Sequence, residues 1–263
     1  MRISVVTPSF NQAQFIRRTI DSILGQTGDF ELDYRVIDGG STDGTIEILE
    51  SYGDRLRWKS EHDNGQVDAI NKGLRETTGD VVGWVNSDDI LLPGALARVA
   101  AAFEAHPERE WVHGYCKIID RDDREVRRWV SAYKAFRARH HTLENFLTEN
   151  YVSQMTAFWR RSVHDAIGYV DPTIRFAFDY DLFVRLASRG EPVYLPEPIA
   201  CFRWYTSSKS GEGYVLQMAE TQRIGTQHHE ATSWTRARAW AKKLAIINIY
   251  RALAVARGIK ARS

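Results

Sequence analysis

The sequence predicts an α/β fold in which a mixed, mostly parallel sheet is flanked by helices. Short apolar segments that fit buried strands alternate with segments whose apolar residues recur on one face of a helix. Residues 81–85 form a run without charged or hydrogen-bonding side chains apart from the Trp84 indole, which is typical of a central strand covered on both faces. Three of the strands end in polar clusters, and ligands of open α/β sheets bind at such strand ends.

The first half of the chain carries this alternation most clearly. Strands and helices that follow one another at this rhythm favour a parallel sheet with right-handed crossovers. The expected strands are residues 3–7, 34–37, 56–60 and 81–85. The helices that follow them carry apolar residues at one-face spacing, namely Ile16, Ile20, Ile23 and Leu24, then Ile46 and Leu49, then Ile70 and Leu74, and then Leu96, Val99 and Phe103 after Pro93.

The second half of the chain is less regular. Residues 111–119 fit a strand, residues 120–123 a tight turn, and residues 125–130 the second strand of a hairpin. Residues 132–149 are polar, basic and aromatic, which fits either a mobile loop or a short amphipathic helix. The remaining expected elements are strands at 152–161 and 192–203 and a helix at 180–187.

Composition indicates a soluble globular protein. Of the 263 residues 43% are hydrophobic and 26% are charged, and the net charge of +1 does not suit a binder of polyanions. Cys116 and Cys201 lack the spacing of a metal site, so we expect free thiols in a reducing compartment. The chain enters a strand at once, without a signal peptide, and no apolar run approaches the roughly 20 residues that span a bilayer. We therefore expect a cytoplasmic protein.

Residues 231–263 differ from the rest because they contain eight Lys or Arg residues and no acidic residue. Aromatic and aliphatic residues such as Trp234, Trp240 and Leu244 lie between the basic ones. A basic amphipathic helix of this kind fits two arrangements. It either lies on the anionic inner face of a membrane or packs on the domain with its basic face in water. No signature of a nucleic-acid-binding fold accompanies the charge, so we expect no nucleic-acid partner.

Polar clusters follow three neighbouring strands of the expected sheet. They are Pro8-Ser9-Phe10-Asn11, Asp38-Gly39-Gly40 and Asn86-Ser87-Asp88-Asp89. Because the carboxyl ends of parallel strands meet at one edge of a sheet, the three clusters predict a crevice for a ligand. Asp38 either accepts a hydrogen bond from a ring N–H of a nucleobase or forms the turn before the two glycines.

The adjacent carboxylates of Asp88 and Asp89 repel each other unless a cation or a hydrogen-bond donor compensates. One interpretation is a turn that caps the next helix, and the other is a binding site. Neither common phosphate-binding motif is present, because Thr45 stands where a P-loop requires Lys and the glycines miss the dinucleotide spacing. A diphosphate would then need a divalent cation, which Asp89 would hold.

Several motifs occur in the order in which one enzyme family has them. They are Thr7-Pro8-Ser9-Phe10-Asn11-Gln12, residues 38–45, residues 63–73, Asn86-Ser87-Asp88-Asp89, Gln154, Phe158-Trp159-Arg160-Arg161 and Phe178-Asp179-Tyr180-Asp181-Leu182. Over residues 3–210 the chain resembles the family 2 glycosyltransferases of the GT-A fold, a Rossmann-like architecture. The resemblance implies one catalytic domain over residues 1–230, with a nucleotide-sugar-binding half (1–110) and an acceptor-binding half (111–230). Residues 231–263 would follow as the basic amphipathic C-terminal helix.

The resemblance also implies roles for single residues. Asp89 would ligate Mg²⁺ or Mn²⁺ at the diphosphate, and Asp179 would be the general base. Gln154 and Arg203 are placed to contact the acceptor or a phosphate. The residues that would surround the nucleotide sugar are Pro8, Ser9, Asn11, Asp38, Asp68 and Asp88.

The sequence departs from the family pattern near the expected base. Phe178 stands where many members have Glu, and Tyr205 stands where many have a His that assists metal or phosphate binding. Asp181 is the alternative base. Residues two apart on a helix do not share a face, so Asp179 and Asp181 would point in different directions.

The implied activity is inverting, metal-dependent transfer of a sugar, of the hexosyltransferase type, from a nucleoside-diphosphate sugar to an acceptor hydroxyl. The acceptor would be a sugar or a lipid-linked sugar, in the biosynthesis of a surface polysaccharide or glycolipid. Two other classes stay open. A nucleotidyltransferase usually carries a glycine-rich, Lys-bearing signature that is missing here, and Phe178 and Tyr205 would suit a non-catalytic binder of sugar nucleotides.

Overall fold

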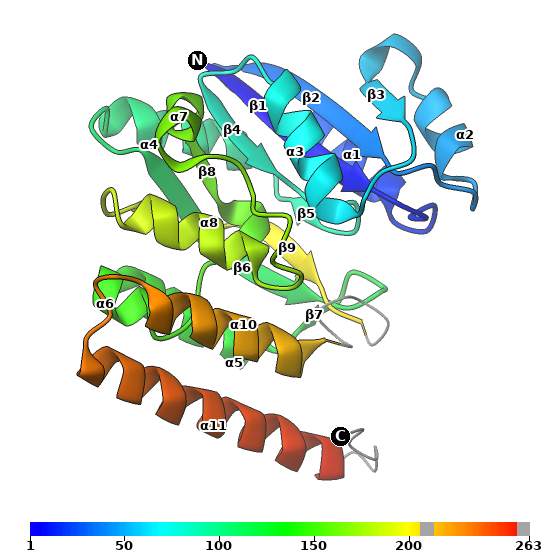
Figure 1. Cartoon of the computed structure of the whole chain (residues 1–263). Helices are drawn as coiled ribbons and strands as arrows, with labels where there is room; N and C mark the ends of the chain where they lie inside the picture. The colour runs from blue at the N-terminus through cyan, green and yellow to red at the C-terminus, as the bar shows by residue number, and fades with distance from the viewer. Residues whose placement is uncertain (206–212, 257–263) are drawn as a thin grey trace.

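The computed structural model describes residues 1–205 and 213–256 of the chain (Figure 1). Within these residues nine strands form one sheet. The strands are β1 (Arg2–Ser9), β2 (Glu31–Asp38), β3 (Arg57–Ser60), β4 (Val81–Trp84), β5 (Ile90–Leu91), β6 (Trp111–Ile119), β7 (Glu125–Val126), β8 (Phe158–Arg160) and β9 (Val193–Arg203).

Helices lie on both faces of this sheet. The α-helices are α1 (Ile16–Leu24), α2 (Thr45–Glu50), α3 (Gln66–Glu76), α4 (Ala95–Ala105), α5 (Arg128–Arg139), α6 (Leu143–Phe146), α7 (His164–Ile167), α8 (Phe178–Ala187), α10 (Tyr214–Gln227) and α11 (Ser233–Ala256). Short 3₁₀ turns are η1 (Gly53–Arg55), η2 (Gln154–Thr156) and η3 (Arg161–Val163).

The sheet is mixed and mostly parallel, as the sequence predicts. Its strand order is β3-β2-β1-β4-β8-β6-β9-β5, and β7 pairs with β6. The first four strands of this order pair in parallel, so their carboxyl ends lie at one edge of the sheet. β8 runs antiparallel between β4 and β6, whereas β6 and β9 are parallel to each other.

The strand β5 follows β4 closely in the chain but pairs with β9 instead of a neighbour of β4. Residues 85–89 therefore lead from the middle of the sheet to its far end (Figure 1). They form the loop that contains Asp88 and Asp89. The loop is thus bounded by β4 on one side and by β9 on the other.

Two buried clusters of apolar side chains, one on each face of the sheet, hold the layers together. On one face α3 and α8 pack against Trp84 and Trp159, whose rings meet edge to face at 5.6 Å. On the other face α1 and α4 pack against Ile3, Val5 and Val81. Burial on both faces agrees with the uninterrupted apolar pattern of the central strands.

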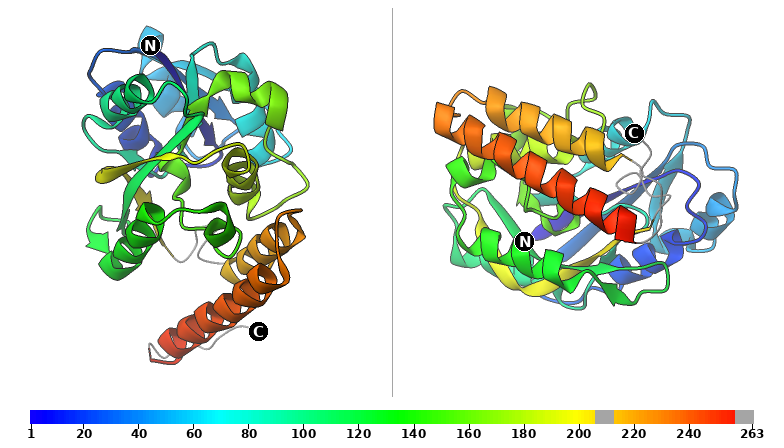
Figure 2. Two further views of the ribbon diagram at one scale, coloured as in Figure 1. Left: turned by 90° about the vertical axis from the view of Figure 1, so that its left-hand side faces the viewer. Right: turned by 90° about the horizontal axis from the view of Figure 1, so that it is seen from below.

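The C-terminal helices extend the structure away from the sheet. α10 packs on α8, and α11 packs on α10, so that the three helices form successive layers (Figures 1 and 2). The buried residues Ala231, Thr235 and Ala239, each four positions from the next, turn one face of the α11 region toward the body. Of the two arrangements predicted for residues 231–263, packing on the domain is present in their described part, but Arg238 and Lys242 face the body instead of water.

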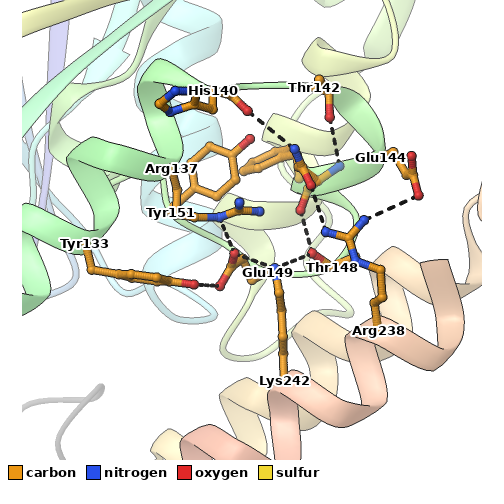
Figure 3. A network of polar contacts seen from close by, with 12 residues as sticks. Tyr133, Arg137, His140, Thr142, Glu144, Thr148, Glu149, Tyr151, Arg238 and Lys242 are labelled. Atoms are coloured by element: carbon orange, nitrogen blue, oxygen red, sulfur yellow. Dashed lines mark hydrogen bonds and ion pairs between the residues drawn. The ribbon is translucent and has the colours of Figure 1, made fainter. Parts of the chain in front are cut away.

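Polar contacts also join α11 to the segment around α6 (Figure 3). Lys242 donates hydrogen bonds to Glu149 (2.6 Å) and Thr148 (2.8 Å). Arg238 donates to the side-chain oxygen of Asn145 at 3.0 Å. On its other side Glu149 accepts hydrogen bonds from two residues of α5, Tyr133 (2.7 Å) and Arg137 (2.5 Å), so one carboxylate connects α5 and α11.

The structure corrects several expected elements of the second half. Of the two alternatives for residues 132–149 the helical one is present, as the end of α5 and as α6. The expected hairpin strand at 125–130 is cut to the two residues of β7, because Arg127 has a left-handed backbone (φ 53°) that ends the strand before α5. The expected strand at 152–161 is reduced to η2 and β8, and β5 and α10 were not predicted.

Among the described residues no helix is both long enough and apolar enough to cross a bilayer.

Candidate active site

A cavity of about 930 Å³ opens at the carboxyl ends of β1 and β4. This volume lies in the upper part of the range for small-molecule sites. The first half of the chain contributes strand ends and the start of α3, including Ser9, Gln66 and Asp88. The second half contributes residues of α5, α8 and α10, including Lys134 and Asp179. The crevice predicted from the polar strand ends is therefore present, and both halves of the chain enclose it.

Asp38 lies at the end of β2, beside the end of β1, but its carboxylate does not face the cavity. It is fully buried and accepts hydrogen bonds from the backbone N–H groups of Gly40 and Ser41. The hydroxyls of Ser41 (2.6 Å) and Ser60 (2.8 Å) donate to it as well. Of the two interpretations of Asp38, the geometry favours the turn-forming one, because its oxygen atoms are already engaged.

Asp63 is the carboxylate that the structure places in the cavity wall at this end. Its Oδ2 lies only 2.7 Å from the position that a Cβ atom on Gly39 would occupy. Its other oxygen accepts the N–H of Gly65 at 2.8 Å. Gly39 thus leaves the space that Asp63 fills, a relation between two loops that the sequence order alone does not reveal.

The residues at the end of β1 have two different roles. Two of them line the cavity, and a third connects the loop after β1 to the loop after β2. Pro8 and Ser9 line the cavity, and the buried Ser9 hydroxyl has no hydrogen-bond partner in the described part of the chain. Asn11 is exposed and lies outside the lining. Its side chain accepts the N–H of Thr42 at 2.9 Å, and its own N–H donates to Ser41, which ties the β1 loop to the β2 loop.

Asp68 also lies outside the cavity lining. It accepts the backbone N–H of Asn64 at 3.1 Å and pairs with Lys72 at 3.2 Å on α3. The hydrogen bond from Asn64 is the main reason that the pKa of Asp68 is lowered. Its position fits the start of a helix, where a carboxylate is stabilised by the N–H groups of the first turn.

The neighbouring carboxylates of Asp88 and Asp89 face different surroundings. Asp89 is fully buried, and its carboxylate accepts the backbone N–H of Arg203 (2.9 Å) and the side-chain N–H of Asn86 (3.1 Å). Burial and the nearby charge of Asp88 raise its pKa well above the usual range. Asp88 is the one that lines the cavity, and burial raises its pKa too.

Tyr205 and Arg203, from the end of β9, hold the loop that carries Asp88. The Tyr205 hydroxyl donates to the Asp88 carboxylate at 3.0 Å. Arg203 is fully buried and donates to the carbonyl oxygens of Asp88 (2.9 Å) and Asp120 (2.8 Å), while it pairs with Asp123 at 2.5 Å. These bonds commit the Arg203 guanidinium to the protein, although the residue forms part of the cavity wall.

The surroundings of Asp88 suit a divalent cation that a ligand helps to hold, but not one held by the protein alone. No group of three or more His, Cys, Asp or Glu side chains in the described ranges could hold a metal by itself. Asp88 nevertheless places a carboxylate in the cavity wall, where burial raises its pKa. Mg²⁺ and similar hard cations are often held by one or two carboxylates together with substrate phosphates and water. The donor set therefore suits a cation that arrives with a diphosphate.

Asp179 and Asp181 lie in the first turn of α8, and only Asp179 lines the cavity. Asp181 forms an ion pair with Arg185 at 2.8 Å, and Arg185 also donates to the carbonyl oxygen of Tyr169. Phe178 is buried in the wall beside Asp179, with its ring centroid 6.4 Å from that of Trp84. The two acids thus differ in the way that their spacing on a helix predicts.

Gln154 occupies the wall between the two halves of the chain. Its side-chain N–H donates to the carbonyl oxygen of Trp84 at 2.6 Å, which fixes the amide in place. Its Oε1 atom is buried in the cavity wall and has no hydrogen-bond partner among the described residues. This oxygen is therefore a buried acceptor at the edge of the cavity.

Part of the wall comes from residues that the sequence did not single out. Lys134 lies on α5, and Val130 one turn earlier lines the cavity as well, a spacing that a helical interpretation of this segment would have revealed. Met218 and Thr221 of α10 complete the wall, and no motif marks them in the sequence.

Comparison with known families gives a match over most of the chain. The profile of the family described as Glycosyl transferase family 2 matches residues 4–168. A PGL/p-HBAD biosynthesis glycosyltransferase of Mycobacterium bovis is 32% identical over 191 residues, which cover 70% of this chain and 69% of that protein. An uncharacterized glycosyltransferase of Rickettsia typhi is 26% identical over 192 residues, which cover 71% and 59% of the two chains.

Solved structures share the fold at low sequence identity. TarS 1-349 of S. aureus in complex with UDP-GlcNAc gives a TM-score of 0.66 at 19% identity, over 93% of this chain and 72% of that one. In the longer TarS structure the match spans 43% of that chain. The mannosyltransferase PcManGT of Pyrobaculum calidifontis, in complex with GDP-Man and Mn²⁺, gives 0.61 at 18% identity, over 96% and 80%.

Proposed function

The chain belongs to glycosyl transferase family 2 and has the GT-A fold, and from this premise we propose that it transfers a sugar from a nucleoside-diphosphate sugar to an acceptor hydroxyl, with inversion at the anomeric carbon. One observation carries the proposal. Asp88 from the first half of the chain and Asp179 from the second half line the same cavity. The reaction needs a group that holds a cation at the leaving diphosphate and a base that takes the proton of the acceptor hydroxyl, on opposite sides of the transferred sugar.

In the proposed reaction Asp179 acts as the general base. It accepts the proton of the acceptor hydroxyl while the oxygen attacks the anomeric carbon and the nucleoside diphosphate leaves. The sugar carries oxocarbenium-like charge in the transition state, as in glycoside hydrolysis. Asp179 lies at the start of α8, beside the buried Phe178, and this fixed place would keep the base in position for the attack.

A divalent cation, Mn²⁺ or Mg²⁺, would neutralise the charge that develops on the leaving diphosphate. We assign Asp88 and not Asp89 as its protein ligand, because the Asp89 carboxylate is buried and engaged by Arg203 and Asn86. The GT-A structure of PcManGT with GDP-Man and Mn²⁺ agrees with such a requirement. Tyr205 would orient the Asp88 carboxylate through its hydrogen bond.

The nucleobase end of the donor site would lie at the ends of β1 and β2, where Pro8 and Ser9 line the cavity. Here we assign Asp63 as the carboxylate that contacts the nucleoside, because the Asp38 carboxylate is engaged by Ser41 and Ser60. Asn11 and Asp68 would support this end of the site without touching the donor.

The acceptor would bind against the second half of the chain. Residues 1–110 would form the donor-binding half and residues 111–230 the acceptor-binding half of one catalytic domain, as their contributions to the cavity wall suggest. Gln154 is one polar group of this wall, and we assign it to the acceptor. The mycobacterial relative is named for PGL/p-HBAD biosynthesis. For this chain we propose a sugar or lipid-linked sugar as the acceptor, in the biosynthesis of a surface polysaccharide or glycolipid.

Residues 231–263 would bring the enzyme to the inner face of the membrane, where a lipid-linked acceptor is presented. The described part of α11 keeps Trp234, Trp240 and Leu244 exposed at 67, 59 and 39% of their surfaces. Aromatic residues among basic ones are typical of helices that lie at a membrane surface. Residues 257–263, with the last three basic residues, lie outside the described part.

The substitution Asp179→Asn tests the proposed reaction. A screen of nucleoside diphosphates and their sugars by thermal shift with Mn²⁺ first identifies the donor. Loss of the base should then lower the rate of transfer by roughly 10²- to 10⁴-fold. The affinity for the donor should stay unchanged, because Asp179 would act on the acceptor.

Asp181→Asn is the matched control, since it changes a neighbouring acid that lies outside the cavity lining and pairs with Arg185. It should leave the transfer rate within a fewfold of wild type. Wild-type transfer by the Asp179→Asn variant would refute the assignment of the base. Release of pyrophosphate from a nucleoside triphosphate would identify a nucleotidyltransferase, and donor binding without transfer to any acceptor pool would identify a binding protein.

A further inference from the structure

The helix α5 uses two faces for two different purposes. Tyr133 and Arg137 face the Glu149 carboxylate, which fixes the helix against α6 and α11 (Figure 3). Val130 and Lys134, also one turn apart, line the active-site cavity instead. The position of the Lys134 side chain is therefore set by a helix that is anchored on its other face.

Lys134 brings a positive charge into the cavity wall. None of the ion pairs within residues 1–205 and 213–256 involves it, and its one hydrogen bond, to the Ser153 hydroxyl, is long at 3.4 Å. By contrast the nearby guanidinium groups of Arg137 and Arg203 are paired with Glu149 and Asp123. Burial lowers the pKa of Lys134, and the charges of Cys116, Asp179 and Glu149 partly offset this effect.

Two other side chains that can donate hydrogen bonds line the cavity. Ser153 carries a hydroxyl next to the Lys134 ammonium, and Asn150 lines the cavity three residues earlier. The side-chain oxygen Oδ1 of Asn150 already accepts the backbone N–H of Val152 at 3.1 Å, so the side-chain NH₂ group is left as a donor. An ammonium, a hydroxyl and an amide NH₂ together suit an oxyanion, because such a group accepts several hydrogen bonds.

Lys134, Ser153 and Asn150 come from the second half of the chain, which we assign to the acceptor. Asp179 and Gln154 line the same second-half wall, whereas Asp88 and the strand ends proposed for the donor belong to the first half. We propose that Lys134, with Ser153 and Asn150, binds an anionic group of the acceptor, either a phosphate or a carboxylate. The inference rests on the proposed function and narrows the class of acceptor.

The electrostatics of the wall give such a cation a purpose. An anionic acceptor that approaches the carboxylate of Asp179 is repelled, and this repulsion weakens binding in a cavity where the effective dielectric constant is low. A positive charge at Lys134 offsets this repulsion. The bound anion in turn replaces the interactions with water that the ammonium group loses on burial. Lysine acts as a point charge, so both the trigonal planar carboxylate and the tetrahedral phosphate fit it.

The test compares Lys134→Met and Lys134→Arg with wild type. Each protein is saturated with Mn²⁺ and with the nucleoside diphosphate found in the donor screen. The affinities for glucose, glucuronate and glucose 6-phosphate are then measured by ligand-observed NMR. Lys59→Met is the control, because the Lys59 ammonium lies on β3, pairs with Glu61 at 2.8 Å and is outside the cavity lining.

Wild type and Lys59→Met should bind at least one anionic probe about tenfold more tightly than glucose. Preference for glucuronate would indicate a carboxylate acceptor, and preference for glucose 6-phosphate a phosphorylated one. Lys134→Met should lose the preference, Lys134→Arg should largely keep it, and the affinity for the nucleoside diphosphate should be unchanged in all variants.

Three results would overturn the inference. They are a wild type that does not prefer either anionic probe, a Lys134→Met variant that keeps the preference, and a Lys134→Met variant that loses affinity for the nucleoside diphosphate instead. In each of these cases the donor still binds, and the proposed function stands. If wild type binds no nucleoside diphosphate or nucleotide sugar, the proposed function itself fails, and the inference fails with it.

Discussion

Asp88 and Asp89 are neighbours in the sequence, yet partners far away in the chain give them different surroundings. The N–H of Arg203, 114 residues away, holds the Asp89 carboxylate inside the protein. The Tyr205 hydroxyl bonds to Asp88, which stays in the cavity wall. A similar difference separates Asp38 from Asp63 at the other end of the site, since Asp38 accepts four hydrogen bonds from Gly40, Ser41 and Ser60, whereas Asp63 accepts one from Gly65.

The substitution Gly39→Ala tests the role of Asp63 at this scale. The added methyl group would lie 2.7 Å from Asp63 Oδ2, closer than real Cβ contacts, so the short carboxylate must move. Loss of one hydrogen bond to a charged group costs about 1.5–3 kcal/mol, so the affinity for the donor should fall roughly ten- to hundredfold. Isothermal titration with the donor from the screen measures it.

Two further variants complete this experiment. Asp63→Asn should weaken donor binding in the same direction without filling the space at Gly39. Gly190→Ala is the control, because no atom lies within 4 Å of the position of its added Cβ, and it should bind the donor as wild type does. Unchanged donor affinity in both Gly39→Ala and Asp63→Asn would contradict the assignment of Asp63.

At the scale of secondary-structure elements, α5 and α11 depend on one buried carboxylate. Only 8% of the Glu149 side chain is exposed, and it accepts hydrogen bonds from Tyr133, Arg137 and Lys242 (Figure 3). Burial by itself raises the pKa of Glu149. The hydrogen bonds from Lys242 and Tyr133 and the nearby positive charges outweigh this effect, so its pKa is lowered below the usual 4.5.

The substitution Glu149→Gln should therefore destabilise the protein at neutral pH. Removing one partner leaves Arg137 and Lys242 with uncompensated charge, which costs about 3 kcal/mol for a buried pair. Urea unfolding at pH 7 measures the difference. Glu144→Gln is the control, because its half-exposed carboxylate pairs with Arg238 only at 3.4 Å, and it should cost less than about 1 kcal/mol.

The difference between wild type and Glu149→Gln should also depend on pH. A carboxylate whose pKa is lower in the folded than in the unfolded protein stabilises the fold above its unfolded pKa of 4.5. This contribution disappears as the pH falls through the lower pKa of the folded state. The destabilisation should thus be largest near neutral pH and shrink below about pH 4. A difference that grows on acidification would contradict the lowered pKa.

Across the whole molecule, the sequence predicts the first half of the fold well because its signals are local. Apolar strands, helix faces and polar strand ends each depend on neighbours in the chain, and the crevice follows from them. The surroundings of Asp38 and Asp89 could not be predicted in this way, since they depend on Ser60 and on the backbone of Arg203. Lys134 was missed because residues 132–149 fitted two structures equally well.

Attachment to membranes belongs to the same scale, and the double substitution Trp234→Ser with Trp240→Ser tests it. Both indoles are exposed, so the fold and the affinity for the donor should be unchanged. Sedimentation with vesicles of phosphatidylglycerol and phosphatidylcholine should fall severalfold, because interfacial binding scales with the apolar surface that is buried.

Vesicles of phosphatidylcholine alone provide the control, since exposed basic residues of α11 such as Arg236 should favour the anionic lipid. Equal sedimentation of the double variant and wild type would mean that the exposed face of α11 has no part in membrane binding. The helix would then serve only to cover α10.

The return of β5 to the side of β9 also has a consequence for the order in which the active site is completed. The loop that carries Asp88 is made early in synthesis, but the strand that fixes it, with Arg203 and Tyr205, is made more than 100 residues later. Domains fold as units once their parts are available. A nascent chain that ends near residue 110 would therefore contain nearly all residues proposed to bind the nucleotide sugar, but the loop with Asp88 would not yet be ordered. Binding of the nucleotide sugar should begin only after β9 has left the ribosome.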